Sequence, residues 1–76
     1  MSKHIQRIRA LALAAGFLLG IHQGRLTLWH EGDPHPVQIY DIRADSLPPA
    51  DRLELERGIR ARDRQELWQI LENYLD

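Results

Sequence analysis

Cysteine is absent from this chain of 76 residues. Disulfide bridges and thiolate-bound zinc are therefore excluded, although small domains often rely on them because a short chain buries little surface. The length allows one domain with a small core. Also missing are a glycine-rich phosphate loop, a Gly-x-Ser-x-Gly motif and a cysteine nucleophile. Without these catalytic patterns, we predict a protein that is not an enzyme and binds no cofactor.

Acidic residues are absent from residues 1–30, which carry four basic side chains. Residues 31–76 hold eleven acidic residues and six arginines, a net charge of −5. This uneven charge predicts two segments with different roles. It also argues against nucleic acid as a partner, because the later segment has the wrong sign for binding phosphate.

A run of twelve residues, 10–21, has no charged or strongly polar side chain. As a helix it would span about 18 Å, against about 30 Å for the hydrocarbon core of a bilayer. That length fits a signal peptide or signal anchor, although no clear cleavage site follows it. The alternative is a helix packed on the rest of the domain or on a second copy of the chain, in a soluble cytoplasmic adaptor or a homo-oligomerising domain.

Basic residues precede this run, so the N-terminus would stay in the cytoplasm if residues 8–22 insert into the membrane. The C-terminus would then lie outside the cell. We assign residues 1–23 to this hydrophobic segment and residues 24–76 to a folded domain.

Two alternating segments predict a β-hairpin. Residues 25–29 place Leu26 and Leu28 on one face, and residues 37–42 alternate again with many strand-forming side chains. Residues 31–36 between them contain two prolines and a glycine, which is typical of a turn. The two strands are expected to pair in antiparallel fashion.

Two helices and a short third strand are predicted after the hairpin. The first helix starts near the prolines at 48 and 49, with Ser46 or Leu47 as the cap, and ends at Gly58. A weak strand at 59–61 follows. Asp63 then begins a capping box. Behind it, apolar residues at helical spacing form one stripe: Leu67, Ile70, Leu71, Tyr74 and Leu75. The predicted fold is α+β, in the order β-β-α-β-α behind the N-terminal segment.

Several of these segments, taken in order, resemble a known family. They are Gly24-Arg25-Leu26-Thr27-Leu28-Trp29, Val37-Gln38-Ile39-Tyr40-Asp41-Ile42, Leu47-Pro48-Pro49-Ala50-Asp51-Arg52-Leu53, Gly58-Ile59, Glu66-Leu67 and Leu71-Glu72-Asn73-Tyr74. The chain is similar here to the C-terminal domain of BofC, the bypass-of-forespore C protein of spore-forming bacteria, and to small relatives that carry this domain behind one hydrophobic segment.

The resemblance implies an extracytoplasmic, non-catalytic protein. BofC is a secreted regulator that restrains a signalling protease during sporulation, and it has a separate N-terminal domain that this sequence does not match. We interpret the motif residues themselves as structural, because helix caps and core packing account for them. They are Leu47, Pro48, Asp51, Gly58, Ile59, Asp63, Leu67, Leu71 and Tyr74.

Three groups of residues are candidates for a site. Trp29 and Tyr40 are expected on the sheet face opposite Leu26 and Leu28, where they could contact a protein partner. Two histidines and two carboxylates in residues 30–35 could approach a divalent ion, but their spacing matches no established metal motif, and we predict a polar loop without metal. The arginines at 60, 62 and 64 and the acidic side chains from 51 to 66 are interpreted as solvated faces. The partner's identity and the oligomeric state stay open.

Overall fold

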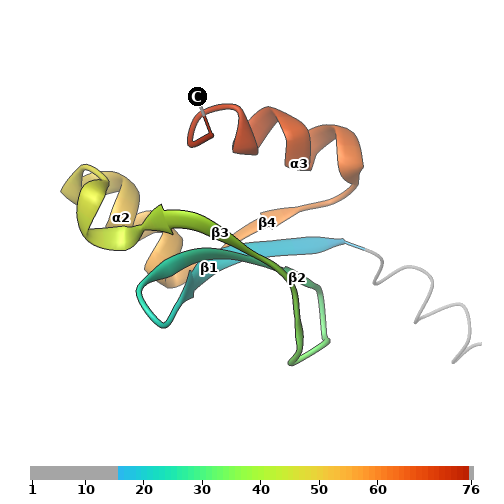
Figure 1. Cartoon of the computed structure of the whole chain (residues 1–76). Coiled ribbons are helices and arrows are strands. Elements are labelled where there is room, and N and C mark those ends of the chain that lie inside the picture. Colours follow the sequence, from blue (N-terminus) through green and yellow to red (C-terminus); the bar gives the residue numbers. More distant parts are fainter. Residues whose placement is uncertain (1–15, 76) are drawn as a thin grey trace, which may run out of the picture.

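The computed structural model describes residues 16–75 and shows four strands and two α-helices (Figure 1). The strands form one antiparallel sheet in the order β3-β2-β1-β4. The predicted α+β class is confirmed. In chain order the elements are β1 (Phe17–His22), β2 (Arg25–His30), β3 (Pro36–Arg43), the 3₁₀ turn η1 (Ala44–Ser46), α2 (Pro49–Arg57), β4 (Ile59–Ala61) and α3 (Arg64–Leu71).

Strand β1 corrects the prediction of a helix across residues 17–21. It pairs with β2 along its whole length and with β4 at Phe17–Leu19. Gln23 and Gly24 both have positive φ, 54° and 78°, as a two-residue hairpin turn requires. The folded domain therefore includes residues before 24. The rest of the predicted N-terminal segment, residues 1–15, lies outside the described residues.

A strand in the middle of a sheet explains why the sequence pattern was misread. Leu19 is 0% exposed, and Leu18 on the other face is half-buried. A strand covered on both faces has an almost continuous apolar sequence, with no period of two to reveal it. Such a run cannot be told from a buried helix by its pattern alone.

The predicted hairpin is present as β2 and β3, with its loop at residues 31–35. Its pairing is irregular, with shifts of register between Arg25 and Thr27 and between Leu28 and Trp29. Thr27 is fully buried, and its hydroxyl donates a hydrogen bond of 3.0 Å to the carbonyl of Arg25. This bond meets the requirement that a buried polar group has a partner.

Helix α3 runs across one face of the sheet and closes the core against it (Figure 1). Most of the predicted stripe faces inward: Leu67 and Leu71 are buried, and Ile70 and Tyr74 pack on the core from half-buried positions. Leu75 is the exception, at 41% exposed, and the helix ends at Leu71, before Tyr74 and Leu75. Each fully buried leucine contributes about 1.5–3 kcal/mol. The core consists of Phe17, Leu19, Leu26, Leu28, Leu55, Ala61, Leu67 and Leu71.

Three residues mark the ends of the helices. Pro48 is the N-cap of α2, which corrects the prediction of Ser46 or Leu47, and no side chain caps that helix. The Ser46 hydroxyl instead donates to the Arg43 carbonyl at 2.7 Å. Gly58, with φ of 92°, ends α2. Asp63 caps α3 by accepting a 2.9 Å hydrogen bond from the backbone amide of Glu66.

Candidate protein-interaction groove

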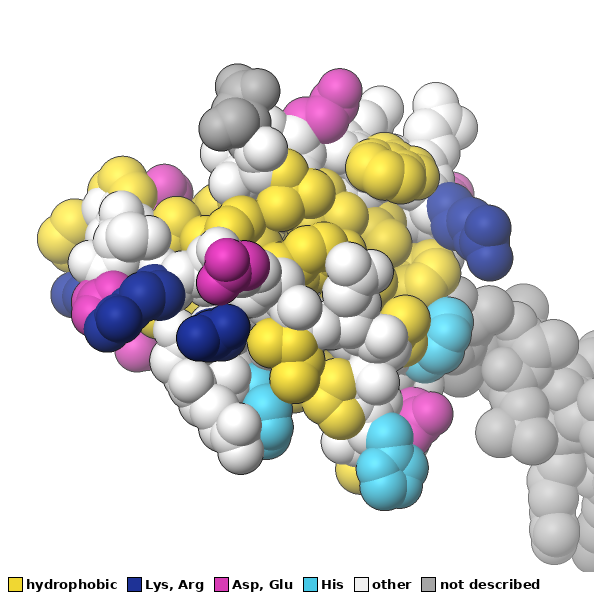
Figure 2. Space-filling view, in the orientation of Figure 1, with side chains coloured by type: hydrophobic (Ala, Val, Ile, Leu, Met, Phe, Trp, Pro, Cys, Tyr) yellow, Lys and Arg dark blue, Asp and Glu magenta, His cyan; other side chains and the backbone are white. Residues whose placement is uncertain are grey.

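An apolar groove of about 340 Å³ separates α3 from strands β2 and β3. We call it the α3 groove and define it by the residues on which the argument depends: His30, Val37, Tyr40, Arg64, Trp68 and Leu75. Its floor is the buried core, with Leu28 from the sheet and Leu67 from the helix. Figure 2 shows hydrophobic side chains gathered in a band on this face of the molecule.

Trp68 is the most exposed large apolar side chain of this groove, at 62%. It lies next to the inward stripe of α3, so the helix buries Leu67 while leaving the indole at the rim. Val37, from the start of β3, is 46% exposed in the same groove. Large apolar side chains that stay exposed together are typical of protein contact surfaces, where tryptophan is enriched.

The charged or titratable side chains in the groove are an arginine, a histidine and a tyrosine. Arg64 lines it, and the ring of His30 lies 5.1 Å from that of Phe17 at the same groove. Among residues 16–75, no carboxylate lines the groove and no ion pair includes Arg64. Burial raises the pKa of the Tyr40 hydroxyl, which therefore stays protonated at neutral pH. The groove presents donors and positive charge without a compensating acid.

Trp29 and Tyr40 lie on opposite faces of the sheet, which corrects the prediction that they share one. Thr27 pairs with Ile39, so Tyr40 falls on the face of Leu28 and packs on the core. Trp29 is on the other face, half-buried. The regular alternation of each strand was read correctly, but the register between the strands decides which residues share a face.

Gly20 lies in close contact beneath Trp29. A Cβ at Gly20 would lie 3.2 Å from Cζ3 of Trp29, and the ring of His22 meets the indole edge-on at 6.0 Å. Trp29, Leu18 and Pro34 line a shallow hollow on this side. Trp29 is thus partly occupied by contacts within the domain, whereas Trp68 is not.

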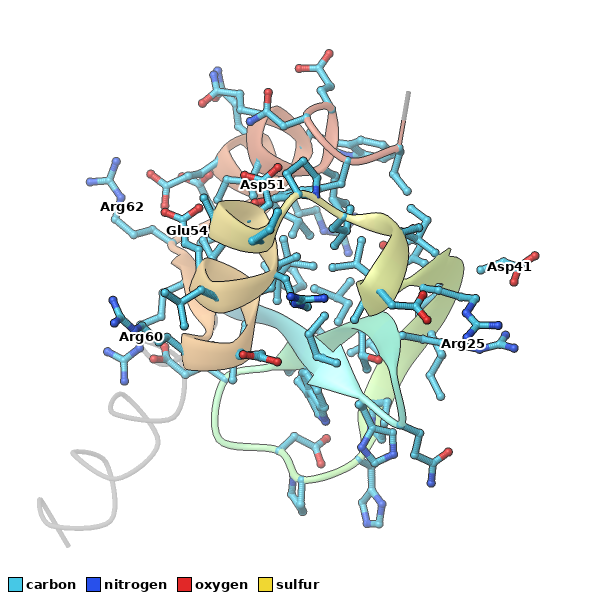
Figure 3. All side chains as sticks on the ribbon, turned by 90° about the vertical axis from the view of Figure 1, so that its left-hand side faces the viewer. Arg25, Asp41, Asp51, Glu54, Arg60 and Arg62 are labelled. Carbon is cyan, nitrogen blue, oxygen red and sulfur yellow. The ribbon has the colours of Figure 1, made fainter. Side chains whose placement is uncertain are left out.

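The remaining predicted residues serve the fold. Leu47 and Ile59 pack on the core from half-buried positions, and Pro48 and Asp51 lie at the start of α2. The pKa of Tyr74 is raised by burial and, to a smaller extent, by Asp51 and Glu54 of α2. In Figure 3 these two acidic residues lie just below α3.

The hairpin loop does not assemble a metal site. Glu31 pairs with Arg60 at 3.2 Å, and the Asp33 carboxylate accepts a 2.9 Å hydrogen bond from the backbone amide of His35. Within residues 16–75, no three histidine or acidic side chains are placed to hold a metal ion.

The three neighbouring arginines are used differently. Arg62 pairs with Glu66 at 3.0 Å. In Figure 3, Arg60 and Arg62 lie on the side of the molecule opposite Arg25 and Asp41. Arg64 alone reaches the α3 groove.

A second hollow, at the turn after β1, is lined by three arginines. Arg25 pairs with Asp41 at 3.4 Å, and Arg43 pairs with Asp45 at 2.9 Å, an interaction that raises the pKa of Arg43. Only Arg52 of the three has no ion pair among the described residues. Because most of its charge is already balanced by nearby acids, this hollow is a poor anion site.

Sequence reasoning missed the α3 groove. Trp68, which stands beside the apolar stripe, was not among the predicted contact residues, and Arg64 was grouped with solvated arginines. The sequence did contain one indication: Trp68 stands next to an apolar stripe that is already wide enough to form the core-facing side of the helix, so its indole is not needed in the core. The groove itself could not be inferred, since it depends on where α3 crosses the sheet.

The model of one protein family, described as the BofC C-terminal domain, matches residues 12–76. The chain belongs to the BofC C-terminal domain family. The match includes β1, in agreement with the place of this strand in the sheet. BofC proteins are regulatory and non-enzymatic, and membership indicates a regulatory or interaction role in sporulation signalling.

Comparisons with curated proteins and with solved structures gave no match. In the part of the chain that the structure describes, no helix has the length and hydrophobicity needed to cross a bilayer.

Proposed function

We propose that this protein is a non-catalytic regulatory module that acts by binding another protein through the α3 groove. The observation that carries the proposal is the exposure of Trp68 and Val37 at the rim of a groove whose floor is the hydrophobic core. Membership of the BofC C-terminal domain family supports the regulatory role.

The composition of the groove favours a protein partner over a small-molecule substrate. Tryptophan, tyrosine and arginine dominate the binding energy of protein interfaces, and Trp68, Tyr40 and Arg64 are neighbours here. An acid–base active site needs titratable groups with strongly perturbed pKa values in a cleft. The titratable groups of this groove are instead a tyrosine with a raised pKa, an arginine and a histidine.

Site-specific photo-crosslinking tests this function. A photoreactive amino acid replaces Trp68 in the full-length chain, and in a control chain it replaces Leu53, an equally apolar exposed residue on α2. In cells that produce the protein, we expect a protein crosslink at position 68 and none at position 53. Equal crosslinking at both positions, or none at position 68, would contradict the proposal.

We further propose that the module works outside the cytoplasm and that its partner is a signalling protease. Both steps follow from the resemblance to BofC and from the basic, apolar character of the first fifteen residues. Protease accessibility in intact and lysed cells tests the setting. Protection in intact cells together with a purely soluble fraction would favour the alternative, a cytoplasmic adaptor.

A further inference from the structure

Strand β3 is an open edge of the sheet. It has eight residues, whereas β4 at the opposite edge has only three. Proteins protect such edges with proline, irregular pairing or charged side chains, because unpaired backbone groups accept another strand. Here Pro36 and the register shift between Leu28 and Trp29 protect the start, and the register shift between Arg25 and Thr27 protects the end together with Asp41 and Arg43. Gln38 and Ile39 lie between the two shifts, pair regularly with β2 and carry no charge.

Exposed or half-buried aromatic and aliphatic side chains flank this stretch on both faces of the sheet. On the face of α3 are Tyr40 and Trp68, and on the opposite face Ile39 is 48% exposed. Side chains of an added strand would alternate between these two faces. An extended segment could therefore cover both, while a helix lying in the α3 groove would leave Ile39 exposed to water.

The charge near the β3 edge indicates which kind of side chain the added segment should carry. Residues 16–75 contain ten acidic and seven basic side chains, so the domain is negative overall. The α3 groove is locally positive, because Arg64 lines it and no carboxylate among residues 16–75 does. A segment with an acidic side chain would complement this groove and would be repelled by much of the remaining surface.

We propose that β3 binds an extended segment of the partner as an added antiparallel or parallel strand, with alternating apolar residues and an acidic side chain that reaches Arg64. This inference rests on the proposed function and specifies its binding mode. Backbone hydrogen bonds to the edge around Gln38 and Ile39 would supply affinity, and the surfaces beside Tyr40 and Ile39 would supply specificity, as in other cases of strand addition.

Peptide selection with the full-length chain tests the proposal. A phage library of random twelve-residue peptides is selected against the protein, and enriched sequences are synthesised as probes. We expect alternating apolar residues with at least one acid. Methylating single backbone amides of a probe should weaken binding at least tenfold at every second position and little at the positions between, since only alternate amides of an added strand face β3.

Matched variants of the protein locate the site. Trp68→Ala should weaken probe binding about tenfold, because it removes an exposed aromatic contact, while Leu53→Ala should not. Arg64→Glu should weaken acidic probes at least fivefold, while Arg57→Glu, which alters charge away from the groove, should leave them unchanged. Thermal unfolding of each variant shows that the fold is retained.

Two results overturn strand addition. One is selection of no peptide, or of peptides whose binding ignores Trp68 and Arg64. The other is an N-methyl scan without alternation. Neither changes the outcome of crosslinking at position 68, so the binding mode can fail while the proposed function stands.

Discussion

Truncation of Leu19 tests whether β1 belongs to the folded domain. Its side chain is fully buried in the core, on a strand that lies between β2 and β4, and Leu→Ala at such sites costs about 2–5 kcal/mol because a cavity remains. At about 0.05–0.15 kcal/mol per residue, the sixty residues described here would have a total stability of about 3–9 kcal/mol. Leu19→Ala should therefore remove a large part of it.

Urea unfolding followed by tryptophan fluorescence measures this loss. Trp29 is half-buried beside β1, so its emission should report unfolding. We expect a clearly lower midpoint for Leu19→Ala with an unchanged slope. Leu53→Ala is the control, because that leucine is 50% exposed and should cost less than about 0.5 kcal/mol. If the two variants unfold at the same urea concentration, Leu19 is not in the core and the place of β1 in the sheet is wrong.

Three further predictions concern the same fold. A fragment of residues 24–76 lacks β1 and should show no cooperative unfolding by circular dichroism, whereas residues 16–76 should unfold in one transition. Hydrogen bonds from the backbone and side chain of Arg62 hold the pKa of Glu66 below its ordinary value of 4.5. The stabilising contribution of the Glu66 carboxylate is therefore complete above pH 4.5 and is lost as the pH falls through the lowered pKa. Glu66→Gln should flatten the pH dependence of the melting temperature in this range. Gly58→Ala should lower the free energy of unfolding, measured in urea, by more than about 1 kcal/mol, because φ is 92° and the new Cβ would lie 3.1 Å from Cδ1 of Leu18. Gly24→Ala, also at positive φ but with open space around the new Cβ, should lower it by less.

The parts of the fold that were predicted correctly are those with a local signal. The stripe of α3 repeats at helical spacing, and Asp63 stands three residues before Glu66, where its carboxylate accepts the amide hydrogen bond. The hairpin has alternation on both sides of a turn with prolines. Each of these features depends on neighbours within a few residues, which a single sequence records.

The errors arose where distant pairing decides the structure. Strand β1 has no period because apolar residues that are buried or half-buried stand on both of its faces, and only its pairing with β2 and β4 identifies it. Tyr40 was predicted on the wrong face because its face is decided by the register between β2 and β3, which the alternation within each strand does not reveal. The α3 groove combines both limits, since it needs the correct register of β3 and the position of α3 above it.

The place of β1 also bears on the proposed location of the protein. Insertion of residues 8–22 into a bilayer would remove Phe17 and Leu19 from the core and would leave β2 and β4 without the strand that lies between them. The backbone of β1 is hydrogen-bonded to β2 on one edge and to β4 on the other, so these residues cannot lie in the sheet and in a bilayer at the same time. If the N-terminal segment inserts while this fold is kept, the inserted residues must therefore precede β1.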